Sequence, residues 1–67
     1  MLLSKENIKN LKKGEMIVIK EIYTGREFLC IVSNYENNYI VLSDINNNLI
    51  DKADIFLYNK TWEAYIV

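Results

Sequence analysis

The sequence of 67 residues contains no histidine and no proline, and it has only one cysteine and two glycines. Without histidine, the commonest general acid–base side chain and the commonest metal ligand are both missing. One cysteine cannot form an internal disulfide, and it cannot alone supply a zinc site. Two glycines, Gly14 and Gly25, are too few for a glycine-rich phosphate loop. These absences predict a protein that is not an enzyme and that holds no metal or cofactor.

Long hydrophobic runs are absent too. No stretch approaches the ~18 consecutive apolar residues that span a bilayer, and the opening Met-Leu-Leu is too short for a signal-peptide core. Cys30 lies inside a short apolar run, which is typical of a buried residue in a reducing compartment. We therefore expect a soluble cytoplasmic protein with no membrane contact.

The small size limits how the chain can be stabilised. A domain of this length buries only about 60% of the surface that its unfolded chain exposes, and it often needs a disulfide, a metal or a partner chain. Since the first two are excluded, oligomerisation or unusually good packing of the single chain remains. The sequence predicts one domain over residues 1–67, and we expect it to form a homo-oligomer.

The residues that are present are typical of a globular domain, with 51% hydrophobic and 12% aromatic side chains. Nine asparagines and ten isoleucines indicate an AT-rich coding genome, as in low-GC bacteria and their phages. The net charge of -1 hides an asymmetry, because residues 1–20 carry a charge of +3 and residues 21–67 carry -4.

Local patterns predict a short helix followed by strands. Ser4 is a good N-cap, Leu3 can pack onto Ile8, and Gly14 is a typical stop residue, so we expect a helix over residues 5–13. Apolar runs separated by turn residues predict five strands. These are residues 16–23, 27–35, 39–45, a fourth within 49–58 (most clearly Ile55 to Tyr58) and 62–67. The fold class is then mainly β: a short N-terminal α-helix and a five-stranded, strongly bent antiparallel sheet that forms a small barrel.

Several predicted strands are apolar on both faces. In residues 27–35, alternation places Phe28, Cys30 and Val32 on one face. It places Leu29, Ile31 and Tyr35 on the other. One face forms the core, and the short helix cannot cover all of the other, so we expect a surface that binds another chain. The candidate interface residues are Tyr58, Trp62, Tyr65 and Val67.

Two features are candidate ligand sites. The first is a stripe of lysines on the predicted helix, Lys5, Lys9, Lys12 and Lys13, which spans about 100° and suits phosphates or an acidic partner. The second is a pair of turns whose rings and amides suit stacking on a base: Tyr35, Asn37, Asn38, Tyr39, Asn59 and Lys60. The alternatives are a solvated helix face and ordinary turn chemistry.

The order of elements resembles the Sm-like small β-barrel, a variant of the SH3-like barrel. The segment from Tyr35 to Asp44 is similar to that family's strand-turn-strand stretch: an aromatic, an acid, a turn, and an apolar strand that reaches Leu-x-Asp. Residues 54–59 lie where the family's second motif stands. The resemblance implies a barrel, association through the edges of the last strands, and RNA binding.

Three functions remain open from the sequence. The first is a small non-enzymatic binding protein of a phage or mobile element, such as a host-defence inhibitor. It would act as a homo-oligomer that binds a host protein or sequesters a small nucleotide. The second is an Sm-like ring that binds RNA or single-stranded nucleic acid, against which the isoelectric point of 5.3 argues. The third is an SH3-like accessory domain with a structural role.

Overall fold

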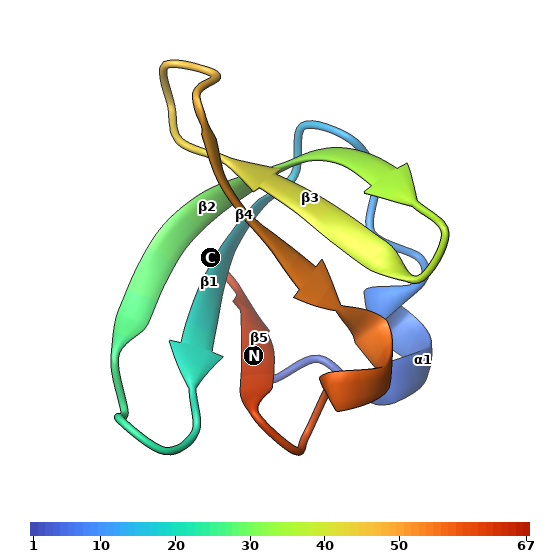
Figure 1. Cartoon of the computed structure of the whole chain (residues 1–67), viewed down its shortest axis with the longest axis vertical. Coiled ribbons are helices and arrows are strands. Elements are labelled where there is room, and N and C mark those ends of the chain that lie inside the picture. The colour runs from blue at the N-terminus through green and yellow to red at the C-terminus, as the bar shows by residue number, and fades with distance from the viewer.

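Five β-strands form one antiparallel sheet in the order β4-β3-β2-β1-β5 in the computed structural model, which describes residues 1–67 (Figure 1). In chain order the elements are α1 (Lys5–Ile8), β1 (Met16–Glu21), β2 (Glu27–Glu36), β3 (Tyr39–Ser43), β4 (Leu49–Asp54), the 3-10 helix η1 (Ile55–Leu57) and β5 (Trp62–Ile66). The prediction of a mainly β fold with a short N-terminal helix and a five-stranded antiparallel sheet is confirmed.

The strand β2 carries the bend of the sheet. Its first half, residues 27–31, pairs with β1, and its second half, residues 31–36, pairs with β3. The register shifts between Val32 and Asn34, and such a β-bulge increases the local bend and twist. The two halves of the sheet therefore curve around a shared interior, as the long arc of β2 shows (Figure 1).

The same bulge changes the face on which Tyr35 lies. Strict alternation predicts that Tyr35 lies opposite to Val32. The extra residue at the bulge shifts the alternation by one, and Tyr35 packs against the core. That prediction is therefore wrong for Tyr35. The predicted core face of Phe28, Cys30 and Val32 is confirmed.

Thirteen buried residues form the hydrophobic core. Alternate residues of β1, β2, β3 and β5 supply most of them, and α1 and η1 contribute one isoleucine each. Burying a large apolar side chain contributes roughly 1.5–3 kcal/mol, so this cluster is the main source of stability. The core members with no exposed surface are Ile8, Ile17, Val32, Ile40 and Ala64.

The helix α1 is shorter than the sequence predicts. Ser4 caps it as predicted, because its side-chain oxygen accepts a hydrogen bond from the Asn7 backbone N–H at 3.2 Å. The helix ends at Ile8 with Lys9 as its C-cap, so the prediction of a helix over residues 5–13 is wrong beyond Ile8.

The chain leaves the helix in order to bury Leu11. Leu11 is only 6% exposed, and its carbonyl accepts a hydrogen bond from the Tyr35 hydroxyl. A short helix is marginal in water by itself. Packing Leu11 into the core therefore outweighs the hydrogen bonds that a longer helix would gain.

The fourth strand lies earlier in the chain than predicted. The sequence places it most clearly at Ile55 to Tyr58, but β4 is Leu49–Asp54, and residues 55–57 form η1. The Asp54 carboxylate caps η1 by accepting a hydrogen bond from the Phe56 N–H at 2.9 Å. A short apolar run is ambiguous between a strand and a helical turn, and here the cap decides for the turn.

Residues 1–3 cover the outer edge of β5. The Leu3 N–H donates to the Ala64 carbonyl at 2.9 Å, and the Ile66 N–H donates to the Met1 carbonyl at 2.9 Å. The Tyr58 hydroxyl donates to the Leu3 carbonyl and accepts from the Ala64 N–H at 3.4 Å. Because this edge is already paired, association through it, which the Sm-like resemblance implies, would require residues 1–3 to leave.

Asparagines shape three of the predicted turns. Asn37, Asn47 and Asn59 have φ angles of 53°, 64° and 66°. Asparagine tolerates this left-handed region better than other residues with a side chain. The turns predicted at residues 36–38, 46–48 and 59–61 are therefore confirmed.

Candidate functional site

A groove of about 480 Å³ lies where α1, the β2–β3 turn and η1 meet. This volume is within the usual range of small-molecule sites, about 300–1,000 Å³. The groove is lined by Lys5, Lys9, Tyr35, Asn37, Asn38, Ile55 and Phe56. Five of these are candidate site residues from the sequence. Lys5 and Lys9 come from the predicted lysine stripe, and Tyr35, Asn37 and Asn38 come from a predicted turn. We call this groove the basic groove.

The helix α1 positions the two lysines of the basic groove. Lys5 and Lys9 are four residues apart, so they lie on the same side of this helical turn. Ile8 is fully buried and anchors the turn in the core, while both lysine side chains are exposed. Two ammonium groups therefore face solvent at one wall of the groove.

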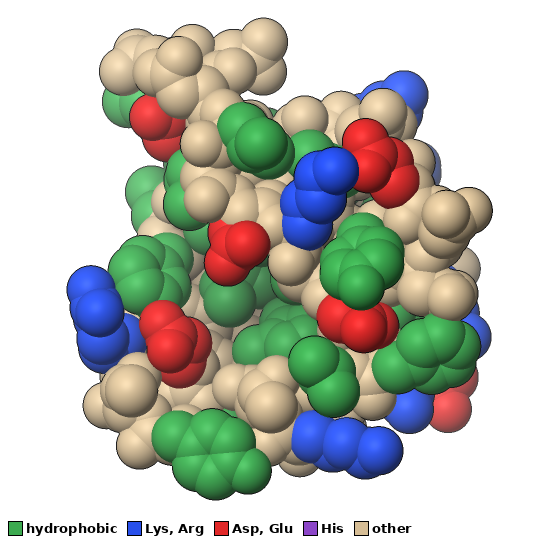
Figure 2. Space-filling view, viewed as in Figure 1, with side chains coloured by type: hydrophobic (Ala, Val, Ile, Leu, Met, Phe, Trp, Pro, Cys, Tyr) green, Lys and Arg blue, Asp and Glu red, His purple; other side chains and the backbone are tan.

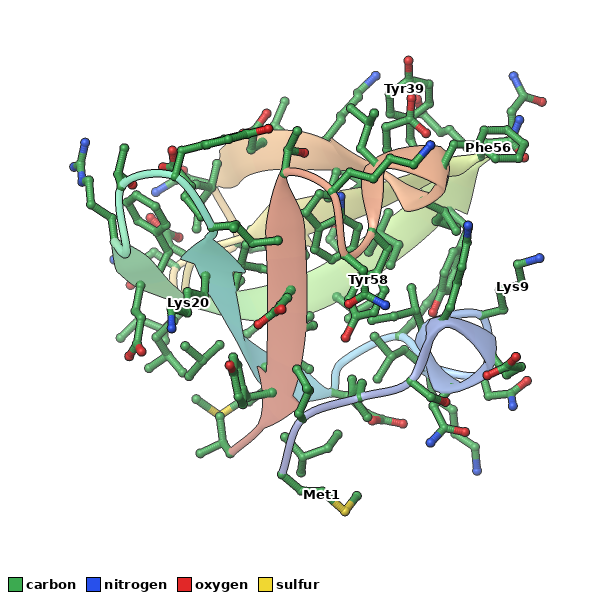
Figure 3. All side chains as sticks on the ribbon, turned by 90° about the horizontal axis from the view of Figure 1, so that it is seen from below. Met1, Lys9, Lys20, Tyr39, Phe56 and Tyr58 are labelled. Carbon is green, nitrogen blue, oxygen red and sulfur yellow. The ribbon has the colours of Figure 1, made fainter.

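The 3-10 helix η1 positions an aromatic ring at the opposite wall. Ile55 is 9% exposed and packs into the core, whereas its neighbour Phe56 is 59% exposed. The Ile55 N–H donates to the Asn38 carbonyl at 2.8 Å, which joins η1 to the β2–β3 turn. Figure 3 shows that Phe56 and Lys9 project on the same side of the molecule.

The β2–β3 turn supplies the polar part of the groove. The side-chain amides of Asn37 and Asn38 are exposed, and Asn37 holds the turn in the left-handed region. The Tyr35 hydroxyl is committed to the Leu11 carbonyl, so Tyr35 contributes its ring rather than its hydroxyl. Burial, with a smaller effect from the charge of Glu15, raises the pKa of Tyr35 and keeps the phenol protonated.

The charge of the basic groove contrasts with that of the whole chain. Its lining contains two lysines and no carboxylate, although the protein has a net charge of -1. Two cations, a ring and two amides are the groups that hold a phosphate, stack on a base and donate to its edge.

Other candidate residues lie outside the basic groove. Lys12 and Lys13 follow the end of α1, so the four-lysine helical stripe does not exist, and the prediction of one continuous stripe is wrong. Tyr39 is 42% exposed at the start of β3. Asn59 and Lys60 are exposed in the turn between η1 and β5, and neither lines the groove.

The candidate interface residues fall into two groups. Tyr58 and Trp62 are only 1% and 6% exposed, and their rings pack edge to face with centroids 5.0 Å apart. The Trp62 indole N–H also donates to the Asp54 carbonyl at 2.7 Å. Because both side chains belong to the core of this chain, the prediction that they form an interface is wrong. Tyr65 is partly exposed and Val67 is 70% exposed, so both remain available to a partner.

Two groove residues, Ile55 and Phe56, are missed by the sequence reasoning. Phe56 belongs to an apolar run that reads as a buried strand, so its exposure is not expected. The available signal is Asp54, a good helix N-cap placed before the run.

Comparisons of the chain with protein-family models, with curated proteins and with solved structures give no match.

No three cysteine or carboxylate side chains gather in a group that could hold a metal ion. Neither helix has the length and apolar content needed to cross a bilayer.

Proposed function

We propose that this protein is a small non-enzymatic binding protein that takes a small nucleotide in the basic groove. One observation carries the proposal. The lysines of α1 and the β2–β3 turn, with Tyr35, Asn37 and Asn38, are separate in the sequence but line one groove that contains no carboxylate. Phosphate binding needs the cations, and base binding needs the ring and amides.

In this proposal the two walls of the basic groove bind different parts of the nucleotide. A phosphate lies between the ammonium groups of Lys5 and Lys9. The base stacks on the exposed ring of Phe56, and the amides of Asn37 and Asn38 meet its edge. The core holds the ring and the helical turn through Ile55 and Ile8, so both walls are preorganised.

We further propose that the protein acts as a homo-oligomer through the outer face of β2, β1 and β5. Register places Leu29, Val18 and Tyr65 in one row across these strands. The next row pairs Ile31 with Met16. Leu29 and Met16 are 51% and 42% exposed, which leaves apolar surface in water. This face suits association better than the β5 edge, which residues 1–3 occupy.

The composition supports an origin in a phage or mobile element of a low-GC host and action in the cytoplasm. A nucleotide-sequestering protein of this size is consistent with interference in a host signal. An Sm-like ring that binds RNA is the alternative, and a short RNA would use the same lysines and ring.

Isothermal titration calorimetry with ATP, AMP, adenosine and a short oligouridylate tests the ligand class. We expect ATP and AMP to bind more tightly than adenosine, because adenosine lacks the phosphate. We expect the double variant Lys5→Glu, Lys9→Glu to weaken ATP binding at least tenfold, because it removes both cations that hold the phosphate. A tenfold change corresponds to about 1.4 kcal/mol of binding free energy.

The double variant Lys12→Glu, Lys13→Glu is the matched control, because it changes the net charge by the same amount outside the groove. It should bind ATP within about twofold to threefold of the parent protein, a difference of less than 1 kcal/mol. Equal losses in both double variants would show a general charge effect and contradict the site. Tighter binding of oligouridylate than of any mononucleotide would favour the RNA-binding alternative.

A further inference from the structure

A second groove of about 490 Å³ opens on the concave side of the sheet, between β4 and the β1–β2 hairpin. We call it the acidic groove. Its interior is mostly hydrophobic, and the residues supplied by the core face of the sheet include Ile19, Phe28, Cys30, Leu42 and Trp62. It shares no lining residue with the basic groove.

Carboxylates stand on opposite walls of the acidic groove. Glu21 lies opposite Trp62 and two residues after Ile19, so strand alternation puts its side chain on the core face. Asp51 lies opposite Leu42, on the core face of β4. Figure 2 shows acidic side chains around a hollow with a hydrophobic bottom in the middle of this face.

The one lysine of the acidic groove does not neutralise these carboxylates. Lys52 lies opposite Val41, which is not part of the core cluster, and its ammonium pairs with Glu36 at 2.7 Å. Asp54, a third carboxylate, also lines the groove. The rim of this apolar groove is therefore negative.

Arg26 does not line the acidic groove, but it places a cation over the ring of Phe28, which does. The guanidinium carbon of Arg26 lies 5.2 Å from the centroid of the Phe28 ring. This distance is within the range of cation–π contacts. The Phe28 ring is thus a surface on which a guanidinium group rests favourably.

We propose that the acidic groove binds an arginine or lysine side chain presented by an extended apolar segment of a partner protein. The apolar interior takes the aliphatic stem, and Glu21 and Asp51 take the cationic head. Exposed apolar residues next to the groove, Ile50 at 43% and Leu57 at 40%, take the flanking aliphatic side chains of the segment. A free polyamine has no such side chains, so the structure favours a polypeptide.

The fluorescence of Trp62 reports whether the acidic groove is occupied, because Trp62 lines this groove and is the only tryptophan of the chain. The probe is the acetylated and amidated peptide Ala-Leu-Arg-Leu-Ala, titrated into the full chain while tryptophan fluorescence is recorded. The same peptide with citrulline in place of arginine keeps the planar shape of the head group, but it removes the charge and replaces one donating amino group with an accepting carbonyl oxygen. We expect a saturable change with the arginine peptide and roughly tenfold weaker binding of the citrulline peptide.

The variant Glu21→Gln, Asp51→Asn removes both charges and keeps the oxygen of residue 51 that accepts the Lys52 N–H. It should weaken binding of the arginine peptide roughly tenfold. The control Glu6→Gln, Glu63→Gln changes the net charge equally at residues that do not line the groove, and it should leave binding unchanged. Thermal unfolding of both variants checks that they are folded.

Four results would overturn the proposal. They are the absence of a saturable change, equal binding of the arginine and citrulline peptides, tighter binding of spermidine than of the peptide, and a fluorescence change on dilution without peptide. The last would show that a second copy occupies the groove. None of these results bears on ATP binding, because the basic groove uses different residues.

Discussion

Replacing Tyr58 by phenylalanine tests how the protein closes its sheet. Tyr58 is 1% exposed, and its hydroxyl donates to the Leu3 carbonyl and accepts from the Ala64 N–H at 3.4 Å. The ring and its edge-to-face contact with Trp62 remain in Tyr58→Phe, so only the hydroxyl is removed. Leaving a buried polar group without its partner costs about 1–3 kcal/mol.

That loss is large for a chain of this size. At roughly 0.05–0.15 kcal/mol per residue, its total stability is about 3–10 kcal/mol. Each 1 kcal/mol shifts the Tm of a small domain by about 4–8 °C. Thermal unfolding followed by circular dichroism measures the shift. Tyr23→Phe is the control, because Tyr23 is 83% exposed. Equal Tm values for the two variants would refute the argument that the hydroxyl holds residues 1–3 on β5.

We expect the buried hydroxyl of Tyr58 to make the stability of the protein depend on pH in the alkaline range. Burial raises the pKa of Tyr58 above its ordinary value of 10.0, and it raises that of Tyr35 as well. The unfolded chain therefore loses these protons more readily than the folded chain. The stability contributed by the protonated phenols is complete below pH 10.0 and falls as the pH rises above it. In Tyr58→Phe this alkaline loss should be smaller, as urea unfolding at a series of pH values would show.

Two further substitutions test the backbone and the outer face. Gly14→Ala should cost about 1 kcal/mol in urea unfolding, because φ is +90° and nothing lies within 4 Å of the added methyl group, so backbone strain acts alone. Gly14→Asn should cost less, and equal costs would contradict this reasoning. Leu29→Glu should convert an oligomer to a 7.9 kDa monomer in light scattering, whereas Tyr23→Glu should not. A parent protein that is monomeric at high micromolar concentration would exclude the outer-face interface.

Local signals in the sequence predict most of the sheet. Apolar runs with β-branched residues define β1, β2 and β3, and asparagine-rich turns separate the later elements. These signals act over a few residues, so they are visible without the fold. The N-cap Ser4 is visible for the same reason.

The errors arise where distant residues decide a local structure. Tyr35 changes face because of a bulge that depends on how β2 pairs with β3. The helix stops early because Leu11 has a place in the core. The strand β4 contains charged residues with weak β-propensity, and it forms because β3 offers an edge with which to pair.

The basic groove could be predicted only in part for the same reason. Its lysines and its amide turn are recognisable as candidates, but nothing local places them together. The hydrogen bond between the Ile55 N–H and the Asn38 carbonyl joins residues far apart in the chain. Only the folded chain brings Phe56 to the groove.

The pairing of residues 1–3 with β5 has a consequence for synthesis of the protein in the cell. Met1 and Ile66 are 65 positions apart in the chain, yet they are hydrogen-bonded neighbours. The ribosome therefore releases residues 1–3 long before it makes the strand that they must meet. During that interval the edge of β1 is exposed and can pair with other nascent chains. The edge of β1 is therefore protected only after β5 has been made and has paired with it.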